Sequence, residues 1–159
     1  MTDNQDIQER TLTFAVRVVK LCRFLNEKGG IERILSSQLI RSGTSIGANV
    51  REAQSGQSDR DFLHKMEIAL KEARETEYWL IVLVESGGIN ENKVKSLTQE
   101  IDVIIRILVT ITKNVKKKLR TPNSELLTPN SELRTPKMGI FKNVKSKMLN
   151  FLFLMQKIG

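Results

Sequence analysis

The sequence predicts an all-α protein, an antiparallel up-down-up-down four-helix bundle. Apolar residues recur at alternating spacings of three and four along four long segments, the period of a helix face. Glycine-containing turns separate these segments, and aromatic residues make up only 5% of the chain, which favours helices over sheets. We expect one bundle over residues 1–118, a linker over 119–137 and a tail over 138–159.

The first helix is expected from about Ile7 to Lys28, ended by the glycine pair at 29–30. It carries two neighbouring apolar stripes, which predict the wide buried face of a bundle helix. The first stripe holds Phe14, Val18, Leu21 and Leu25, and the second holds Leu12, Ala15, Val19 and Cys22.

The second helix is expected from about Glu32 to Gln54. Its stripe is Leu35, Leu39, Ser42, Ile46, Asn49 and Ala53. Two of these positions are polar, and such residues in a helix contact either let a neighbouring backbone come close or fix register through a buried hydrogen bond. We therefore expect Ser42 and Asn49 to face another helix rather than solvent.

The third and fourth helices follow short turns. Ser58 is a good N-cap for the third, and Asn90 is the expected cap of the fourth, after Gly87 and Gly88. The third stripe runs Phe62, Met66, Ala69, Ala73, Thr76, Leu80 and Leu83, and the fourth runs Val94, Leu97, Ile101, Ile104, Leu108, Ile111 and Val115. Short connections make consecutive helices antiparallel neighbours.

Residues 38–53 resemble the R-S-x-x-S-I-x-A-N-[IV]-x-E-[AG] signature of a four-helix bundle family, the 23S rRNA intervening-sequence proteins. The match falls on Arg41, Ser42, Ser45, Ile46, Ala48, Asn49, Val50, Glu52 and Ala53. The resemblance covers roughly residues 10–115 and implies a structural role for the signature and a homopentameric assembly. The family includes relatives of the accessory protein of diversity-generating retroelements, which implies binding to RNA and a reverse transcriptase.

The positive charge of the chain belongs to its C-terminal part. Residues 1–112 hold 15 Lys and Arg against 16 Asp and Glu, whereas residues 113–159 hold 11 against 2. The total of +8 therefore says little about the helical body.

The C-terminal part differs in character from the four helices. It repeats Thr-Pro-Asn-Ser-Glu-Leu, and prolines at 122, 129 and 136 exclude a continuous helix, so we expect a disordered linker. Residues 138–159 mix lysines with apolar residues in a basic amphipathic pattern. Such a segment can lie on an anionic membrane surface or pack on a partner, and an accidental extension without selected function is the alternative.

No pattern of catalytic or cofactor-binding residues is present in the sequence. His64 is the single histidine and Cys22 the single cysteine, which excludes a metal site built on two histidines and an intrachain disulfide. We expect Cys22 to be a small core residue and the chain to be cytoplasmic, because residues 1–7 lack the features of a signal peptide. We expect no enzyme activity, metal or cofactor.

One set of residues is a candidate for nucleic-acid binding. Arg10, Arg17 and Lys20 are expected on the outer side of the first helix, with Arg23 nearby, and Arg41 and Arg51 on the second could add to them. Repeated around an oligomer, these cations would form a phosphate-binding belt, whereas a single copy is an ordinary solvated face. We therefore expect a non-enzymatic oligomeric module that binds RNA or a nucleic-acid-processing partner. The alternative is a protein-interaction module that binds no nucleic acid.

Overall fold

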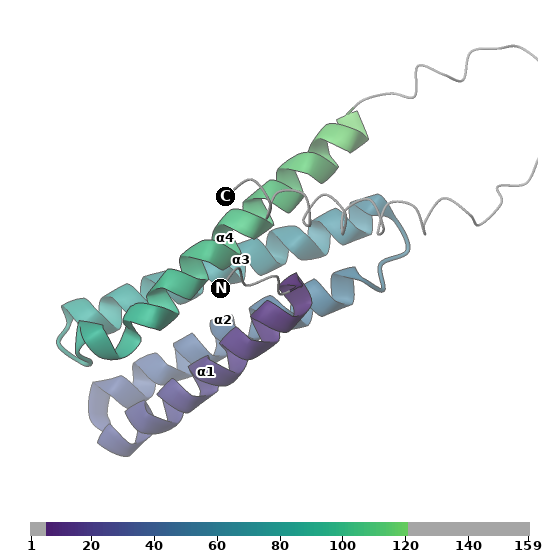
Figure 1. Cartoon of the computed structure of the whole chain (residues 1–159). Helices are drawn as coiled ribbons and strands as arrows, with labels where there is room; N and C mark the ends of the chain where they lie inside the picture. Colours follow the sequence, from purple (N-terminus) through teal and green to yellow (C-terminus); the bar gives the residue numbers. More distant parts are fainter. Residues whose placement is uncertain (1–5, 121–159) are drawn as a thin grey trace, which may run out of the picture. The chain divides into compact units, whose positions relative to one another are not determined.

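The computed structural model describes residues 6–120, which form four α-helices (Figure 1). The helices are α1 (Ile7–Lys28), α2 (Gly30–Ala53), α3 (Asp59–Glu85) and α4 (Glu91–Arg120). No strand occurs between residues 6 and 120, so the predicted all-α bundle is confirmed. The predicted linker and tail lie outside the described residues, apart from the last two residues of α4.

Local sequence signals account for the helix ends. Gly29 has a φ of 75°, a left-handed conformation that favours glycine, and it separates α1 from α2. The Ser58 hydroxyl accepts a hydrogen bond from the Asp61 N–H at 3.1 Å, and the Asn90 side chain accepts one from the Asn92 N–H at 2.9 Å. Ser58 and Asn90 therefore act as the predicted caps of the third and fourth helices.

Along each pair of neighbouring helices, the residue numbers in contact rise on one helix and fall on the other. Neighbours therefore run antiparallel, as Figure 1 shows for the successive helices. Representative pairs are Cys22–Ser36 and Thr11–Gly47 for α1/α2, Arg41–Glu75 and Glu52–Lys65 for α2/α3, Asp59–Lys118 and Glu67–Lys116 for α3/α4, and Arg10–Glu100 and Arg17–Ser96 for α1/α4.

The core consists of the aliphatic stripes of the four helices. The largest fully buried side chains are Phe14, Leu25, Leu39, Ile46, Met66, Leu80, Leu83, Ile101, Ile104 and Leu108. Burial of such side chains is the main stabilising contribution to a bundle, roughly 1.5–3 kcal/mol for each.

The two predicted stripes of α1 differ in how far they are buried. Phe14, Val18 and Leu25, from the first stripe, are fully buried. From the second stripe only Cys22 is buried, and Leu12 is 51% exposed, because none of the described helices covers the side on which Leu12 lies. One chain taken alone therefore buries the first stripe and leaves most of the second uncovered.

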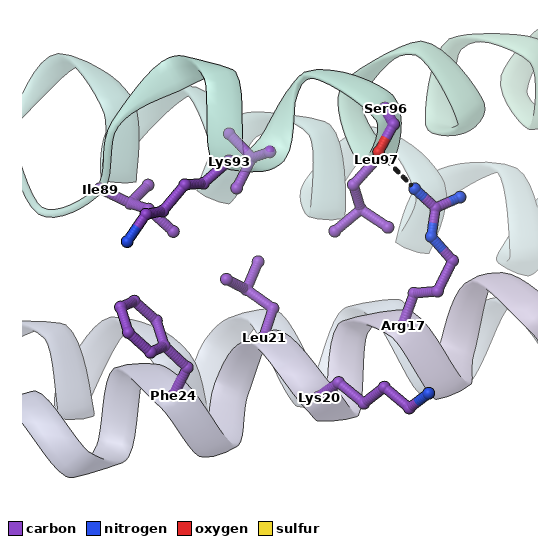
Figure 2. Close-up of a pocket in the computed structure, with 9 residues that line it drawn as sticks. Arg17, Lys20, Leu21, Phe24, Ile89, Lys93, Ser96 and Leu97 are labelled. Carbon is purple, nitrogen blue, oxygen red and sulfur yellow. Dashed lines mark hydrogen bonds between the residues drawn. The ribbon is translucent and has the colours of Figure 1, made fainter.

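The four helices do not contact one another equally. The pairs α1/α2, α2/α3 and α3/α4 touch along much of their length, whereas α1 and α4 touch along far less. An open groove remains between α1 and α4 (Figure 2).

The contact between α1 and α2 depends on a glycine. A Cβ atom built on Gly43 would lie 2.9 Å from Cγ1 and 3.0 Å from Cγ2 of Val18. These distances are shorter than van der Waals contact, and the β-branched Val18 has little freedom to move away. Gly43 therefore permits the close approach of the two helices.

We expect Gly43→Ala to lower the free energy of unfolding by about 1–2 kcal/mol. The overpacking cost against Val18 exceeds the roughly 1 kcal/mol that alanine gains in helix propensity. Urea denaturation followed by circular dichroism measures the change. In a Val18→Ala background the cost of Gly43→Ala should disappear.

Gly47→Ala is the matched control for Gly43→Ala. A Cβ at Gly47 would meet its nearest atom, the Thr11 carbonyl oxygen, at 3.4 Å, an ordinary contact. Alanine should therefore be neutral or stabilising there. Equal effects at the two glycines would contradict the packing explanation.

Candidate functional site

The predicted outer cations of α1 do not form one surface. Arg10 is only 9% exposed, and its Nε lies 3.4 Å from a carboxylate oxygen of Glu100 on α4. The placement of Arg10 on the outer side of the helix was therefore wrong. Its angular position faces α4, where it forms a structural ion pair.

Arg17 and Lys20, in contrast, lie beside the groove between α1 and α4. Arg17 is half-buried and donates a hydrogen bond to the Ser96 hydroxyl at 2.9 Å, which ties the side chain to the groove wall. Lys20 is exposed at the rim. Arg23 is also exposed but does not line this groove.

The two predicted cations of α2 lie apart from the groove. Arg41 forms ion pairs with Glu72 and Glu75 of α3, so its charge is already neutralised within the bundle. Arg51 is exposed on the last turn of α2. The structure thus brings together Arg17 and Lys20, and it does not bring Arg41 or Arg51 to them.

The groove between α1 and α4 combines cations with an apolar floor (Figure 2). Its volume is about 460 Å³, and none of the described residues that line it is acidic. The cations are Arg17, Lys20 and Lys93, the polar residue is Ser96, and the apolar residues are Leu21, Phe24, Ile89, Val94 and Leu97. The described lining of this groove therefore carries positive charge without a carboxylate.

The Phe24 ring holds two ammonium groups at one end of the groove. The Nζ of Lys93 lies 4.9 Å from the ring centroid and the Nζ of Lys28 lies 5.6 Å from it, both within cation–π range. The Lys28 Nζ also donates a hydrogen bond to the Gly88 carbonyl at 2.8 Å. Each such contact contributes roughly 0.5–1 kcal/mol at an exposed ring.

Sequence reasoning missed Phe24, Lys28 and Lys93. They lie on α1 and α4, which are far apart in the sequence. An up-down-up-down order places the first and fourth helices side by side, and this was the signal that could have found them. The residue numbers that face each other depend on the helix rotations, which the sequence pattern alone did not fix.

A second groove lies between α3 and α4 and has a different charge. Glu85, Glu91 and Asp102 line it, with Lys95 as its single lining cation among the described residues. The floor includes Leu80, Ile81 and Val84. The two flanks of α4 therefore carry grooves of contrasting charge.

The signature residues of α2 serve structural roles. Ser42 is buried and its hydroxyl accepts a hydrogen bond from the Thr76 hydroxyl at 3.0 Å, which confirms its predicted helix contact. Asn49 is only half-buried, and its side chain donates to the Ser45 carbonyl, one turn earlier, at 2.8 Å. Within one chain the Asn49 amide is used in its own helix, and the predicted contact of Asn49 with another helix stays a prediction.

The other signature residues also bind within the bundle or lie outside any site. The Ser45 hydroxyl donates to the Arg41 carbonyl at 2.7 Å, Ile46 is fully buried, and Glu52 pairs with Lys65 of α3. Ala48 is exposed. Three signature residues, Arg41, Ser42 and Glu52, therefore join α2 to α3.

The Arg41 guanidinium lowers the pKa of the Glu75 carboxyl. Its hydrogen bond to Glu75 is the largest cause, and a second hydrogen bond comes from the Trp79 indole N–H at 3.2 Å. The Glu72 carboxylate, with its side chain 13% exposed, lies 3.6 Å from the same guanidinium. The cluster favours the ionised form of the Glu75 carboxyl and joins α2 to α3.

We expect Glu75→Gln to reduce the acid sensitivity of the fold. A carboxyl with a lowered pKa in the folded state stabilises the protein above its unfolded pKa, and this stabilisation is lost as the pH falls below the ordinary value of 4.5. Thermal denaturation at several pH values between neutral and strongly acidic measures it. Glu77→Gln, which removes a carboxyl outside the cluster, is the control and should leave the wild-type slope unchanged.

The described residues offer little for covalent or metal chemistry. No group of three or more His, Cys, Asp or Glu residues that could hold a metal ion occurs within residues 6–120. Burial raises the pKa of the Cys22 thiol to about 11, and its Sγ lies 3.4 Å from the Ser36 carbonyl oxygen, to which it donates. Of the four helices, none is apolar enough over its length to cross a membrane.

The chain is similar to one protein family and to a solved structure. A family model described as 23S rRNA-intervening sequence protein matches residues 3–110. A crystal structure from the S23 ribosomal protein family of Bacteroides thetaiotaomicron, of a protein with unknown function, is 44% identical. It matches 68% of this chain and 99% of its own, with a TM-score of 0.64. No match was found among curated proteins. The matched range and the identity show that this chain belongs to the 23S rRNA-intervening sequence protein family.

Proposed function

We propose that this chain is a non-enzymatic helical module that self-associates and binds nucleic acid through the groove between α1 and α4. The observation that carries the proposal is the charge of the groove. Arg17, Lys20 and Lys93 line it, and the lining contains no carboxylate among the described residues. Phosphate groups are the polyanionic ligand that such a row of cations binds most generally.

Several other cations of the bundle are paired with carboxylates, unlike the cations that line the groove. Arg10 and Arg41 have carboxylate partners within the bundle, as do Lys65, Lys116 and Lys118. A cation that is paired in this way gains little by exchanging its partner for a phosphate. The lining of the α1/α4 groove offers no such internal competitor, so binding there neutralises charge that the fold leaves uncompensated.

The single thiol agrees with a reducing, cytoplasmic setting for this activity, since the chain cannot form an internal disulfide.

We expect Lys93→Glu to weaken RNA binding by about tenfold and to lower the salt dependence of binding. Each lost phosphate contact reduces the slope of log affinity against log salt by about 0.7–0.9. Fluorescence anisotropy with labelled RNA at several salt concentrations measures both quantities. Lys20→Glu should act in the same direction.

Lys95→Glu is the matched control for Lys93→Glu. The two lysines are exposed residues on α4, two positions apart, and Lys95 lines the α3/α4 groove instead. The charge change is identical and the C-terminal lysines are present in both variants. Equal losses would show that binding depends on total charge and not on this groove. Absence of RNA binding by the wild type would reject the proposed function.

Self-association is supported by the exposed apolar stripe of α1. Leu12 and Val16 are 51% and 47% exposed and lie one turn apart on the same face, with Ala15 and Val19 half-buried beside them. Contiguous exposed apolar side chains mark protein contacts. The same stripe favours the second candidate function, a protein-interaction module without nucleic-acid binding.

We expect Leu12→Glu to reduce the molecular mass measured by light scattering towards that of one chain. The charge cannot be desolvated in an apolar contact, and the exposed position leaves the bundle core intact. Thr13→Glu, at the next and exposed position, should leave the mass unchanged. A Leu12→Glu variant with wild-type mass would show that this stripe is not the subunit contact.

A further inference from the structure

The α1/α4 groove contains one aromatic residue, Phe24, which is 36% exposed. Figure 2 shows its ring at the Ile89 and Lys93 end of the groove, with Arg17 and Lys20 further along α1. From Arg17 to Phe24 the lining residues of α1 extend about 10 Å along the helix, at 1.5 Å per residue. The groove thus offers an aromatic ring and a row of cations on a single line.

We propose that this groove binds single-stranded nucleic acid, with one base stacked on Phe24 and the neighbouring phosphates held by Lys20, Lys93 and Arg17. The inference rests on the proposed function and specifies its ligand. An unpaired nucleotide supplies both chemistries that the groove requires. Its base is a flat apolar surface for the floor, and its phosphate is an anion for the rim.

A duplex does not satisfy the same groove. Its bases are stacked and paired inside a rigid helix, and its outer surface presents phosphates and sugars. A duplex can therefore contact Lys20 and Lys93 at the rim, but it leaves Phe24, Leu21 and Leu97 uncovered. An acidic peptide likewise offers carboxylates to the rim without a flat aromatic face for the ring.

The lysines at Phe24 do not prevent stacking. Base stacking on an aromatic side chain is generally stronger than a cation–π contact at an exposed ring. A base therefore displaces the Lys93 ammonium from the ring face. The displaced ammonium remains on the flexible side chain beside the groove, where it can bind a phosphate of the same strand.

The test compares the full chain with Phe24→Leu, using an oligouridylate of about 12 nucleotides and an RNA duplex of the same length. Leucine keeps an apolar side chain but removes the ring. We expect affinity for the single strand to fall about 5- to 100-fold, and affinity for the duplex to stay unchanged. Phe24→Trp should restore single-strand binding, because it restores a stacking surface.

Tyr78→Leu is the control for the loss of an exposed aromatic ring. Tyr78 lies on α3, is 57% exposed and does not line this groove. It should leave both affinities unchanged. Circular dichroism and light scattering confirm that the Phe24 variants keep the wild-type fold and mass.

The outcomes separate this inference from the function on which it rests. An unchanged single-strand affinity in Phe24→Leu, or equal losses for single strand and duplex, would overturn the stacking site while RNA binding itself stands. If neither RNA binds the wild type, the proposed function fails as well. If polyglutamate binds instead and Lys93→Glu abolishes that binding, the groove is a site for acidic peptides.

Discussion

The arrangement of the bundle depends on three consecutive residues of α2. Gly43 allows α1 to approach closely at Val18, Ser42 accepts the Thr76 hydrogen bond from α3, and Arg41 forms ion pairs on the same helix, α3. Because α2 contacts both neighbours within one turn, it fixes the spacing of α1 and α3. The position of α4 is then set mainly by its long contact with α3.

The open groove is a consequence of this asymmetry. The contact between α1 and α4 closes the circle of helices and is the least extensive of the four. At its Arg10 end an ion pair with Glu100 joins the two helices. Towards Phe24 the two helices leave the groove that Lys20 and Lys93 line, and none of its described lining residues is acidic. A groove of positive charge therefore arises from where these residues lie, and the basic C-terminal turns of α4 do not line it.

Features that depend on a single helix could be predicted from the sequence. The alternating spacings identified the four helices, and Ser58 and Asn90 acted as the expected caps. The contacts between side chains on two different helices were harder to predict from the sequence. Arg10 and Arg17 lie seven residues apart, yet one pairs with Glu100 and the other contacts Ser96 at the groove. Asn49 follows the stripe of Ser42 in spacing, but rotation of α2 takes it out of the core.

The candidate site shows the same division. Arg17 and Lys20 were found from their position on one helix, whereas Phe24, Lys28 and Lys93 become a site only through the pairing of α1 with α4. A charge sum over the chain pointed to the C-terminal residues. A sum over the chain does not show a local excess of positive charge, because acidic residues outside the lining of the groove cancel these lysines in the sum.

The single buried thiol of Cys22 can serve as a probe of motions in the bundle. Cys22 lies between α1 and α2, its Sγ hydrogen-bonds the Ser36 carbonyl, and the raised pKa keeps it protonated and unreactive in the closed state. An alkylating reagent can reach it only when the packing around it opens. The rate of thiol modification in the unaltered chain is therefore a direct measure of how often the packing around Cys22 opens, without an introduced label.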